Sequence, residues 1–244
     1  MNLFSKAILS AAIIGIALTG CGEKKDNHLK VGAIAGAETQ VAEEAAKIAK
    51  EKFGLEVEIV QFSDFATPNV ALNDGSIDVN AFQHKPYLDS QIKDRGFKLV
   101  AVGNTFVYPI AGYSKKIKAV SELKEGSQIA VPNDPTNLGR SLLLLQKQGL
   151  LKLKDGAGLS ATVLDIVENP KKVKIVELEA AQLPRALEDV DLAIINTVYA
   201  SQVNLQPTRD GLFVEDKDSP YVNLIVAREN NQNDEKVKNF VKSY

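Results

Sequence analysis

Cysteine and histidine are nearly absent from this chain of 244 residues, and each shortage excludes a class of chemistry. Because Cys21 is the sole cysteine, the chain cannot close an internal disulfide, and packing must stabilise it. Its two histidines, His28 and His84, are too few for a zinc or manganese site, which normally needs several converging ligands. Since His28 lies in a polar segment, a catalytic triad would depend on His84 alone. We therefore expect no metal and no cofactor.

Enzyme motifs and basic surfaces are also missing. The sequence contains no Gly-x-Ser-x-Gly elbow, no P-loop and no dinucleotide fingerprint with its spaced acid. The net charge of −2 leaves no basic patch for nucleic acid. An apolar content of 45% and a charged content of 25% are typical of a soluble globular protein. These features favour a protein that binds a small ligand over an enzyme or a nucleic-acid partner.

One apolar run is present, and it lies at the amino terminus between Ala7 and Leu18, after the basic residue Lys6. It is too short to span a hydrocarbon layer of roughly 30 Å, and no second segment is long enough either. A basic residue followed by such a run is typical of a secretory signal peptide. We predict a signal peptide at 1–20.

Cys21 follows this run directly, in the string Leu-Thr-Gly-Cys. We expect it to be the first residue of the exported protein and to carry lipid. The alternative is a free or buried thiol in an ordinary core. The polar residues behind it predict a flexible tether at 21–28, between the lipid and the folded part.

Beyond the tether, strand patterns alternate with helical patterns. Strands are predicted at 29–34, 55–59, 77–82, 97–102, 128–131, 174–178 and 191–195. Helices are predicted at 41–53, 67–74, 86–95, 137–148, 180–187, 197–203 and 233–244. This alternation predicts parallel β-α-β units and therefore an α/β fold with covered sheets.

Two extended runs, 105–114 and 220–228, interrupt this alternation. We interpret both as hinge crossings between two lobes. Lobe 1 would comprise 29–108 and 223–244, and lobe 2 would be the inserted segment 109–222. A cleft between two such lobes, at the carboxyl ends of the strands, is a common site for a small ligand.

The segment that follows the strand at 128–131 suits an anion. Asp134 with the proline after it predicts a turn, and Thr136 or Asn137 could cap the next helix. The amino terminus of that helix offers free N–H groups. Arg140 lies one turn inside, where its guanidinium could grip a carboxylate through two parallel hydrogen bonds. A surface ion pair is the alternative for Arg140.

Aromatic side chains gather near another strand end. Phe82, His84 and Tyr87 lie close together in sequence, and Phe65 lies on an earlier loop. Such rings would suit a polarizable side chain, since a thioether sulfur near a ring edge gains roughly 0.3–1.5 kcal/mol. Ordinary core packing is the alternative for each ring.

Two asparagines complete the candidate site. Asn196 follows the strand at 191–195, and Asn223 lies in the second extended run. Their carbonyl oxygens can accept hydrogen bonds from an ammonium group without adding a charge to a buried pocket. Alternatively, Asn196 caps its helix and Asn223 pairs with the backbone.

Several long strings resemble the NlpA lipoproteins, over essentially the whole chain. These strings are Leu-Thr-Gly-Cys, Asn-Ala-Phe-Gln-His-Lys-Pro-Tyr-Leu, Val-Pro-Asn-Asp-Pro-Thr-Asn-Leu-Gly-Arg, Ile-Asn-Thr-Val-Tyr-Ala and Ser-Pro-Tyr-Val-Asn-Leu. The resemblance implies an α/β, two-lobed periplasmic-binding-protein fold, type II-like, with two crossover strands and a ligand cleft. It also implies a receptor for L-methionine, with D-methionine as a second candidate ligand, that serves the permease and ATPase subunits of an ABC importer. Cys21 would anchor it to a membrane, facing the periplasm or the cell exterior.

The resemblance assigns roles to individual residues. Arg140 would hold the carboxylate of the ligand, while Asn196 and Asn223 would bind the ammonium group and the edge of the carboxylate group. The residues expected to wall the thioether pocket are Phe65, Phe82, His84 and Tyr87, with Asn137 and Tyr199 as weaker candidates behind them. Alternative cargoes are another small apolar amino acid or a methionine-containing dipeptide, and a non-transport surface lipoprotein is a further alternative. Family members usually continue beyond the position of Tyr244 with another helical segment, so truncation of this chain is one interpretation.

Overall fold

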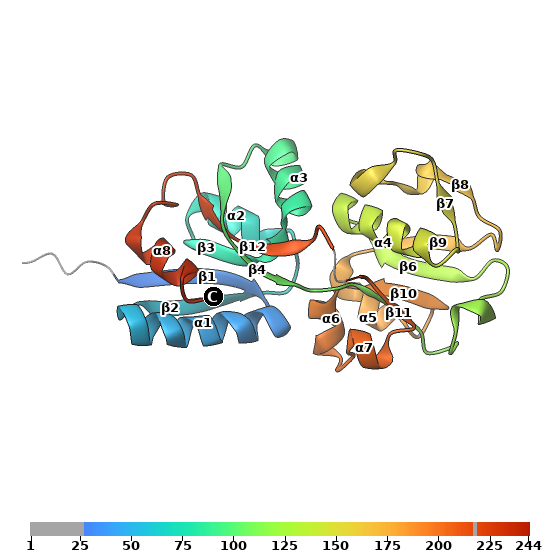
Figure 1. Cartoon of the computed structure of the whole chain (residues 1–244), viewed down its shortest axis with the longest axis horizontal. Coiled ribbons are helices and arrows are strands. Elements are labelled where there is room, and N and C mark those ends of the chain that lie inside the picture. Colours follow the sequence, from blue (N-terminus) through green and yellow to red (C-terminus); the bar gives the residue numbers. More distant parts are fainter. Residues whose placement is uncertain (1–26, 217–218) are drawn as a thin grey trace, which may run out of the picture.

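The computed structural model describes residues 27–216 and 219–244, which form two lobes side by side along the long axis of the molecule (Figure 1). The predicted signal peptide at 1–20, Cys21 and most of the tether at 21–28 lie outside the described residues. The first strand already includes His28, one residue earlier than the sequence patterns indicate.

Lobe 1 is built on a five-stranded sheet with the order β2-β1-β3-β12-β4. Its strands are β1 (His28–Ile34), β2 (Glu56–Phe62), β3 (Val79–His84), β4 (Leu99–Val107) and β12 (Val222–Arg228). Its helices are α1 (Ala37–Phe53), α2 (Thr67–Asp74), α3 (Lys85–Arg95) and α8 (Glu235–Val241). The carboxyl terminus of the chain lies in this lobe, as Figure 1 shows.

Lobe 2 is built on a second five-stranded sheet with the order β11-β5-β10-β6-β9. Its strands are β5 (Ala111–Tyr113), β6 (Gln128–Pro132), β9 (Lys174–Leu178), β10 (Leu192–Ile195) and β11 (Phe213–Val214). Its α-helices are α4 (Pro135–Lys147), α5 (Leu183–Ala186), α6 (Thr197–Gln202) and α7 (Pro207–Asp210). A small antiparallel pair, β7 (Lys152–Leu153) with β8 (Ile166–Glu168), and four short 3₁₀ turns complete the lobe.

Each sheet contains strands of opposite direction, which corrects the expectation of purely parallel units. In lobe 1, β12 runs antiparallel to both β3 and β4. In lobe 2, β5 runs antiparallel to both β10 and β11. The reason is that the chain passes between the lobes twice. Strand β5 is the first strand after the chain enters lobe 2, and β12 is the first after it returns to lobe 1, so each runs away from the junction. The carboxyl ends of β1, β3, β4, β6, β9 and β10 therefore meet the amino ends of β5 and β12 at the junction of the lobes.

Helix α4 starts earlier than the sequence patterns indicate. Its first residue is Pro135, whose fixed φ suits the first turn, and Asp134 is the N-cap. The Asp134 carboxylate accepts a hydrogen bond from the Asn137 N–H at 2.9 Å. The expectation that Thr136 or Asn137 caps the helix is therefore wrong, since the stronger acceptor stands at the residue before the proline. Helix α8 is shorter than the predicted 233–244, since it spans Glu235–Val241 and its N-cap is Asp234.

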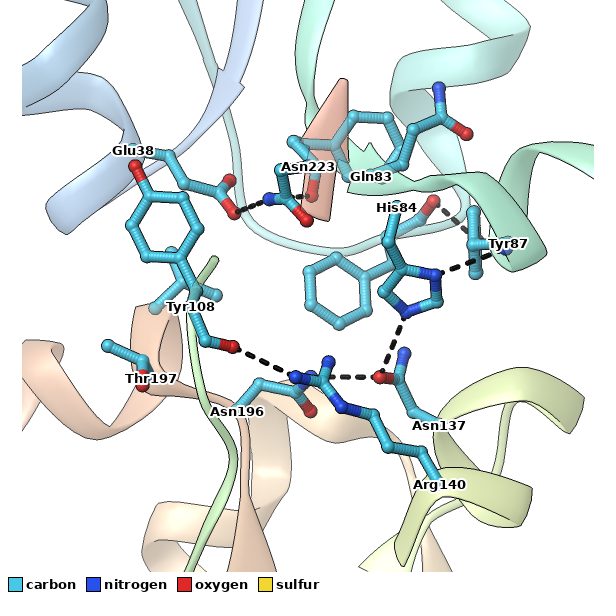
Figure 2. A pocket seen from close by; sticks show the side chains of 13 residues that line it. Glu38, Gln83, His84, Tyr87, Tyr108, Asn137, Arg140, Asn196, Thr197 and Asn223 are labelled. Carbon is cyan, nitrogen blue, oxygen red and sulfur yellow. Dashed lines mark hydrogen bonds between the residues drawn. The ribbon is translucent and has the colours of Figure 1, made fainter. Parts of the chain in front are cut away.

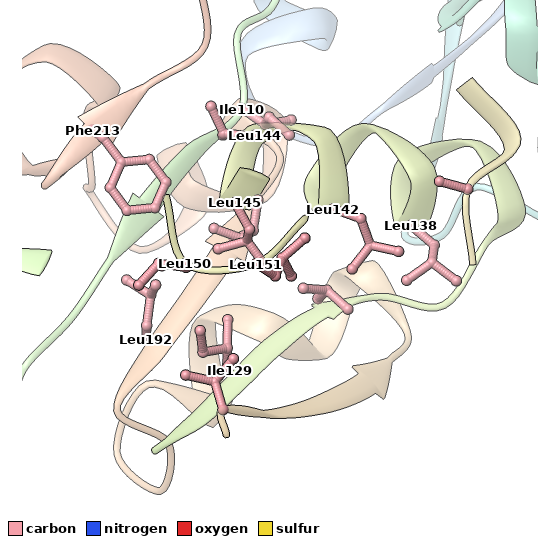
Figure 3. Close-up of a cluster of buried hydrophobic side chains, with 14 of the residues drawn as sticks. Ile110, Ile129, Leu138, Leu142, Leu144, Leu145, Leu150, Leu151, Leu192 and Phe213 are labelled. Carbon is pink, nitrogen blue, oxygen red and sulfur yellow. The ribbon is translucent and has the colours of Figure 1, made fainter. Parts of the chain in front are cut away.

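Helix α4 also supplies much of the core of lobe 2 (Figure 3). Leu142 and Leu145 are fully buried against the sheet, beside Ile129 and Leu192. Burial of each leucine contributes about 1.5–3 kcal/mol relative to exposure. This packing holds the first turn of α4, and with it Asn137 and Arg140, at the edge that faces lobe 1.

Within the residues that the structure describes, we find no helix with both the length and the apolar character needed to cross a membrane.

Candidate functional site

A cavity of about 370 Å³ lies between the two lobes, and side chains from both surround it (Figure 2). Lobe 1 contributes Glu38, Phe65, Phe82, Gln83, His84, Tyr87 and Asn223, the hinge run contributes Tyr108, and lobe 2 contributes Asn137, Arg140, Asn196, Thr197 and Val198. Nine of the thirteen follow the end of a strand, while Phe82, Gln83 and His84 lie in the last residues of β3 and Asn223 lies at the start of β12. One end of the cavity is polar and the other is aromatic.

Arg140 is the cation of the polar end. Its side chain is only 3% exposed, and its guanidinium lies 4.3 Å from the centre of the Tyr221 ring. Nε donates to Oε1 of Glu215 at 2.8 Å, while Nη2 donates to Oε2 of Glu215 and, at 3.0 Å, to the carbonyl oxygen of Tyr108. These bonds fix the plane of the guanidinium and use its Nε and Nη2 hydrogens. The Nη1 group is left to meet an acceptor in the cavity.

An ion pair was the alternative interpretation for Arg140, and an ion pair does form. It is not a surface pair, since Arg140 is buried and the Glu215 side chain is 12% exposed. Glu215 therefore neutralises the charge of the Arg140 guanidinium, while the Nη1 group of Arg140 stays available on the cavity side. Because the pair is neutral, a ligand that binds to Nη1 need carry no net charge.

His84 connects the two lobes. As the N-cap of α3, it accepts a hydrogen bond at Nδ1 from the Tyr87 N–H at 3.2 Å. Its Nε2 lies 3.4 Å from Oδ1 of Asn137, so the proton belongs on Nε2 of a neutral ring. Burial, followed by the Arg140 charge, lowers the pKa of His84 from 6.5 to about 3. His84 is thus a neutral donor across the lobe boundary.

Asn196 continues this chain of hydrogen bonds. Its Nδ2 donates to Oδ1 of Asn137 at 3.1 Å, and its own Oδ1 is buried without a hydrogen-bond partner. Asn196 stands at the N-cap position of α6, yet its side chain makes no capping hydrogen bond. An unpaired buried acceptor costs about 1–3 kcal/mol, so this oxygen is suited to a donor supplied by a ligand.

Glu38 presents a second unpartnered acceptor. It lies in the first turn of α1 and is 4% exposed. Asn223 donates from Nδ2 to Oε1 of Glu38 at 3.1 Å and to the carbonyl oxygen of Phe82 at 2.9 Å. Oε2 of Glu38 is buried and has no partner. Burial raises the pKa of this carboxyl well above its ordinary value, against the smaller effect of its hydrogen bonds.

Rings line the other end of the cavity. Phe65 and Phe82 are stacked at an interplanar angle of 30° with centroids 6.1 Å apart, and Tyr87 meets Phe82 edge-on at 5.9 Å. The Tyr87 hydroxyl donates to the carbonyl oxygen of Phe65 at 2.8 Å and so fixes this wall. The three rings form an apolar, polarizable surface that suits a thioether or an aliphatic chain.

The cavity brings together eight of the nine residues that the sequence singled out: Phe65, Phe82, His84, Tyr87, Asn137, Arg140, Asn196 and Asn223. The ninth, Tyr199, lies behind the aromatic wall, where its ring contacts Phe65 at 5.0 Å. Contact of these residues with a ligand stays a prediction. Asn137 does not offer its N–H to an anion as expected, because Asp134 already accepts it.

Sequence patterns missed two acids of this site. Glu38 follows β1 just as Asn196 follows β10, so its position after a strand end was an available signal. Glu215 gave no local signal, because its partner Arg140 is 75 residues away in sequence. The sequence analysis also assigned no role to five further residues at the site, which are Gln83, Tyr108, Thr197, Val198 and Tyr221.

The two lobes touch beside the cavity. Gln202 of α6 donates to the carbonyl oxygen of Ala35 at 2.6 Å. Gly36 has φ of 119°, and a Cβ at this position would lie 3.0 Å from the carbonyl oxygen of Val198. Glycine therefore permits both the positive φ and the close approach of the lobes. The cleft is closed in this structure.

The buried His84 predicts a loss of stability in acid. Between pH 6.5 and about 3, the unfolded chain binds a proton that folded His84 does not, so the free energy of unfolding falls as the pH falls. The slope from this group reaches about 1.4 kcal/mol per pH unit. Urea unfolding from pH 7 to pH 4 should give a flatter profile for His84→Asn, which keeps an N-cap acceptor. The matched control is His28→Asn at an exposed ring, and an equal flattening there would contradict the assignment.

Comparisons with known proteins agree with this geometry. Residues 29–244 match the sequence model of a family described as NlpA lipoprotein. The chain is 69% identical over 242 residues to the D-methionine-binding lipoprotein MetQ of Escherichia coli K12, covering 98% of this chain and 89% of that protein. It is also similar to the crystal structure of the methionine-binding protein MetQ, with 71% identity, a TM-score of 0.89 and coverage of 90% of both chains. A nutrient-binding protein from Burkholderia cenocepacia, solved with bound methionine, is 54% identical with a TM-score of 0.87 and covers 88% of this chain and 91% of its own.

Proposed function

The chain belongs to the NlpA lipoprotein family, and from this premise we propose that it captures methionine between its lobes and delivers it to an ABC importer. It is a substrate-binding lipoprotein and not an enzyme. The resemblance found in the sequence is thereby confirmed, as is the two-lobed α/β fold. The main observation in support of this proposal is that several polar groups without hydrogen-bond partners surround one cavity between the lobes.

Those groups complement an amino-acid zwitterion. Nη1 of Arg140 can donate to the ligand carboxylate, while Oε2 of Glu38 and Oδ1 of Asn196 lack donors that an ammonium can supply. Asn223 holds Glu38 in place and lines the cavity beside it. The aromatic end would receive the thioether, where contact of sulfur with a ring edge adds roughly 0.3–1.5 kcal/mol.

Closure of the lobes would couple binding to delivery. We assign lobe 1 to 29–108 and 223–244 and lobe 2 to 109–222, with the hinges at 108–110 and 219–221. A ligand that contacts Glu38 in lobe 1 and Arg140 in lobe 2 favours the closed state by the contacts it makes only there. The permease and ATPase subunits of the importer would then bind the closed, loaded form and open it.

We place this protein on a membrane surface. Relatives carry the name lipoprotein, and the string that ends in Cys21 suits lipidation at that residue. Two or more acyl chains on Cys21 would anchor it stably, since each buried methylene contributes about 0.8 kcal/mol. The two lobes would then face the periplasm or the cell exterior.

Calorimetry and thermal unfolding test the cargo. With the full-length chain purified in detergent, L-methionine should bind one to one, and at 100 times its Kd it should stabilise the fold by about 2.7 kcal/mol. Norleucine, which replaces the sulfur by a methylene, should bind only a few-fold more weakly. A larger gain with leucine or with a methionine-containing dipeptide would point to that cargo instead. If none of these ligands raises the melting temperature, the receptor function is wrong and a non-transport lipoprotein becomes the better interpretation.

A further inference from the structure

A second chamber lies next to the cavity, on the far side of its aromatic wall. It is a recess that is open to solvent, and both lobes line it. Phe65 and Tyr87 belong to the linings of both spaces, so the two spaces adjoin at these residues. A ligand whose polar groups meet Arg140 and Glu38 would direct its side chain toward these rings.

The second chamber is acidic. Asp64 from lobe 1 and Asp134 and Glu179 from lobe 2 line it, against one guanidinium, that of Arg95. The Arg95 group lies 5.9 Å from the centre of the Phe97 ring, which offers it a partner of its own. Asp64 and Asp134 accept hydrogen bonds from the starts of their helices. The Glu179 carboxylate accepts a single side-chain hydrogen bond among the described residues, from Asn133 at 3.2 Å, and is therefore the acid most available to a ligand.

Two residues that line this chamber carry buried polar atoms without a hydrogen-bond partner. Tyr199 is 1% exposed, and its hydroxyl has no hydrogen-bond partner. Burial, followed by the charges of Glu38 and Asp64, raises the pKa of this hydroxyl. Oε1 of Gln91 is likewise buried without a partner. An acceptor and a hydroxyl in this state are suited to polar atoms that the protein does not supply.

We propose that the chamber is a subsite for the far end of a ligand side chain longer than that of methionine, and that it prefers a cationic end. This inference rests on the proposed function, because the amino-acid end of the ligand must first occupy the inner cavity. The chemical class is an S-substituted homocysteine whose substituent carries an amine. The thioether would lie at the rings, and the amine would reach Glu179, with Tyr199 and Gln91 as neutral partners.

The same geometry excludes extension at the other end. Arg140, Asn137 and His84 are 3%, 2% and 5% exposed, so the protein closes around the place where the ligand carboxylate would lie. A peptide bond there would remove the charge that pairs with Arg140 and would add atoms to a packed wall. The cleft should therefore reject a residue added through the carboxylate while it tolerates a longer side chain.

Three homocysteine derivatives of similar length test this inference. The probes are S-(3-aminopropyl)-, S-butyl- and S-(3-carboxypropyl)-L-homocysteine, titrated into the full-length chain by calorimetry at low salt. We expect the amine to bind at least tenfold more tightly than the carboxylate, with the butyl compound between them. Higher salt should reduce the ratio of amine affinity to carboxylate affinity, because the chamber is open to solvent ions that screen the charges.

Two variants locate the effect. Glu179→Gln should reduce the ratio of amine affinity to carboxylate affinity about threefold or more, whereas Glu177→Gln, at an exposed position two residues earlier in β9, should leave this ratio unchanged. Equal affinity for the three probes, or no binding of any of them to a chain that binds methionine, would overturn the subsite alone. A chain that binds neither methionine nor the probes would overturn the proposed function, and the subsite with it.

Discussion

Replacement of Arg140 by alanine should abolish most methionine binding, with Kd raised about 100-fold or more. Two effects add. The ligand carboxylate loses its donor, and Glu215, which is 12% exposed, is left as a buried charge without its partner. Truncating one member of a buried, hydrogen-bonded charge pair typically costs about 2–5 kcal/mol. Calorimetry with methionine measures the loss directly.

A general loss of folding must be separated from a loss of binding. Thermal unfolding of Arg140→Ala without ligand gives its folded fraction at the titration temperature. Arg140→Lys keeps the charge but not the planar fork, so its Kd should lie between those of the parent and the alanine variant. The matched control is Arg185→Ala, at an exposed arginine in lobe 2. Unchanged affinity in a folded Arg140→Ala protein would remove this residue from the site.

Replacement of Glu38 by glutamine should weaken methionine binding by about 10- to 100-fold. The reason is that a charged hydrogen bond to the ligand ammonium becomes a neutral one, and hydrogen bonds to charged groups are worth about 1.5–3 kcal/mol. Glu43→Gln is the control, since Glu43 is exposed on the same helix. If Glu38→Gln binds methionine as tightly as the parent, Glu38 does not touch the ammonium.

The pH dependence of the same variant provides an independent test. Because burial raises the pKa of Glu38, the free protein is more stable with this carboxyl protonated, and that stability is lost as the pH rises from 4.5 through the raised pKa. Methionine affinity should change in the opposite sense and increase with pH over the same window, since the ammonium favours the carboxylate. Both slopes should be absent from Glu38→Gln. Calorimetry and urea unfolding at several pH values measure them.

Much of the fold could be predicted from local patterns. The strand at 174–178 agrees with β9 residue for residue, and α2 ends at Asp74, before Gly75, as its sequence indicates. Such positions follow from apolar alternation, proline in a first turn and glycine after a last one. The reversed strands β5 and β12 could not be predicted in this way. Strand direction depends on how the chain passes between lobes, and a window of ten residues does not contain that information.

In the candidate site too, features formed by residues close in sequence could be predicted, and features formed by distant residues could not. Phe82, His84 and Tyr87 lie within six residues of one another, so their clustering was visible in the sequence. The pair of Arg140 with Glu215 joins residues 75 positions apart, and the buried acid Glu38 is coupled to Asn223 across 185 positions. Only packing of the complete chain brings these charges together. For this reason the aromatic wall was predicted more fully than the electrostatics of the polar end.

The position of β12 between β3 and β4 also has a consequence for the order in which the newly made polypeptide can mature. Lobe 2 is one uninterrupted stretch, so it can complete its sheet as soon as β11 has been synthesised. The sheet of lobe 1 lacks a central strand until residues 222–228 emerge, and until then β3 and β4 expose unpaired backbone edges. The half of the molecule that begins first therefore finishes last, and a chaperone that shields those edges during export would act on residues 79–107.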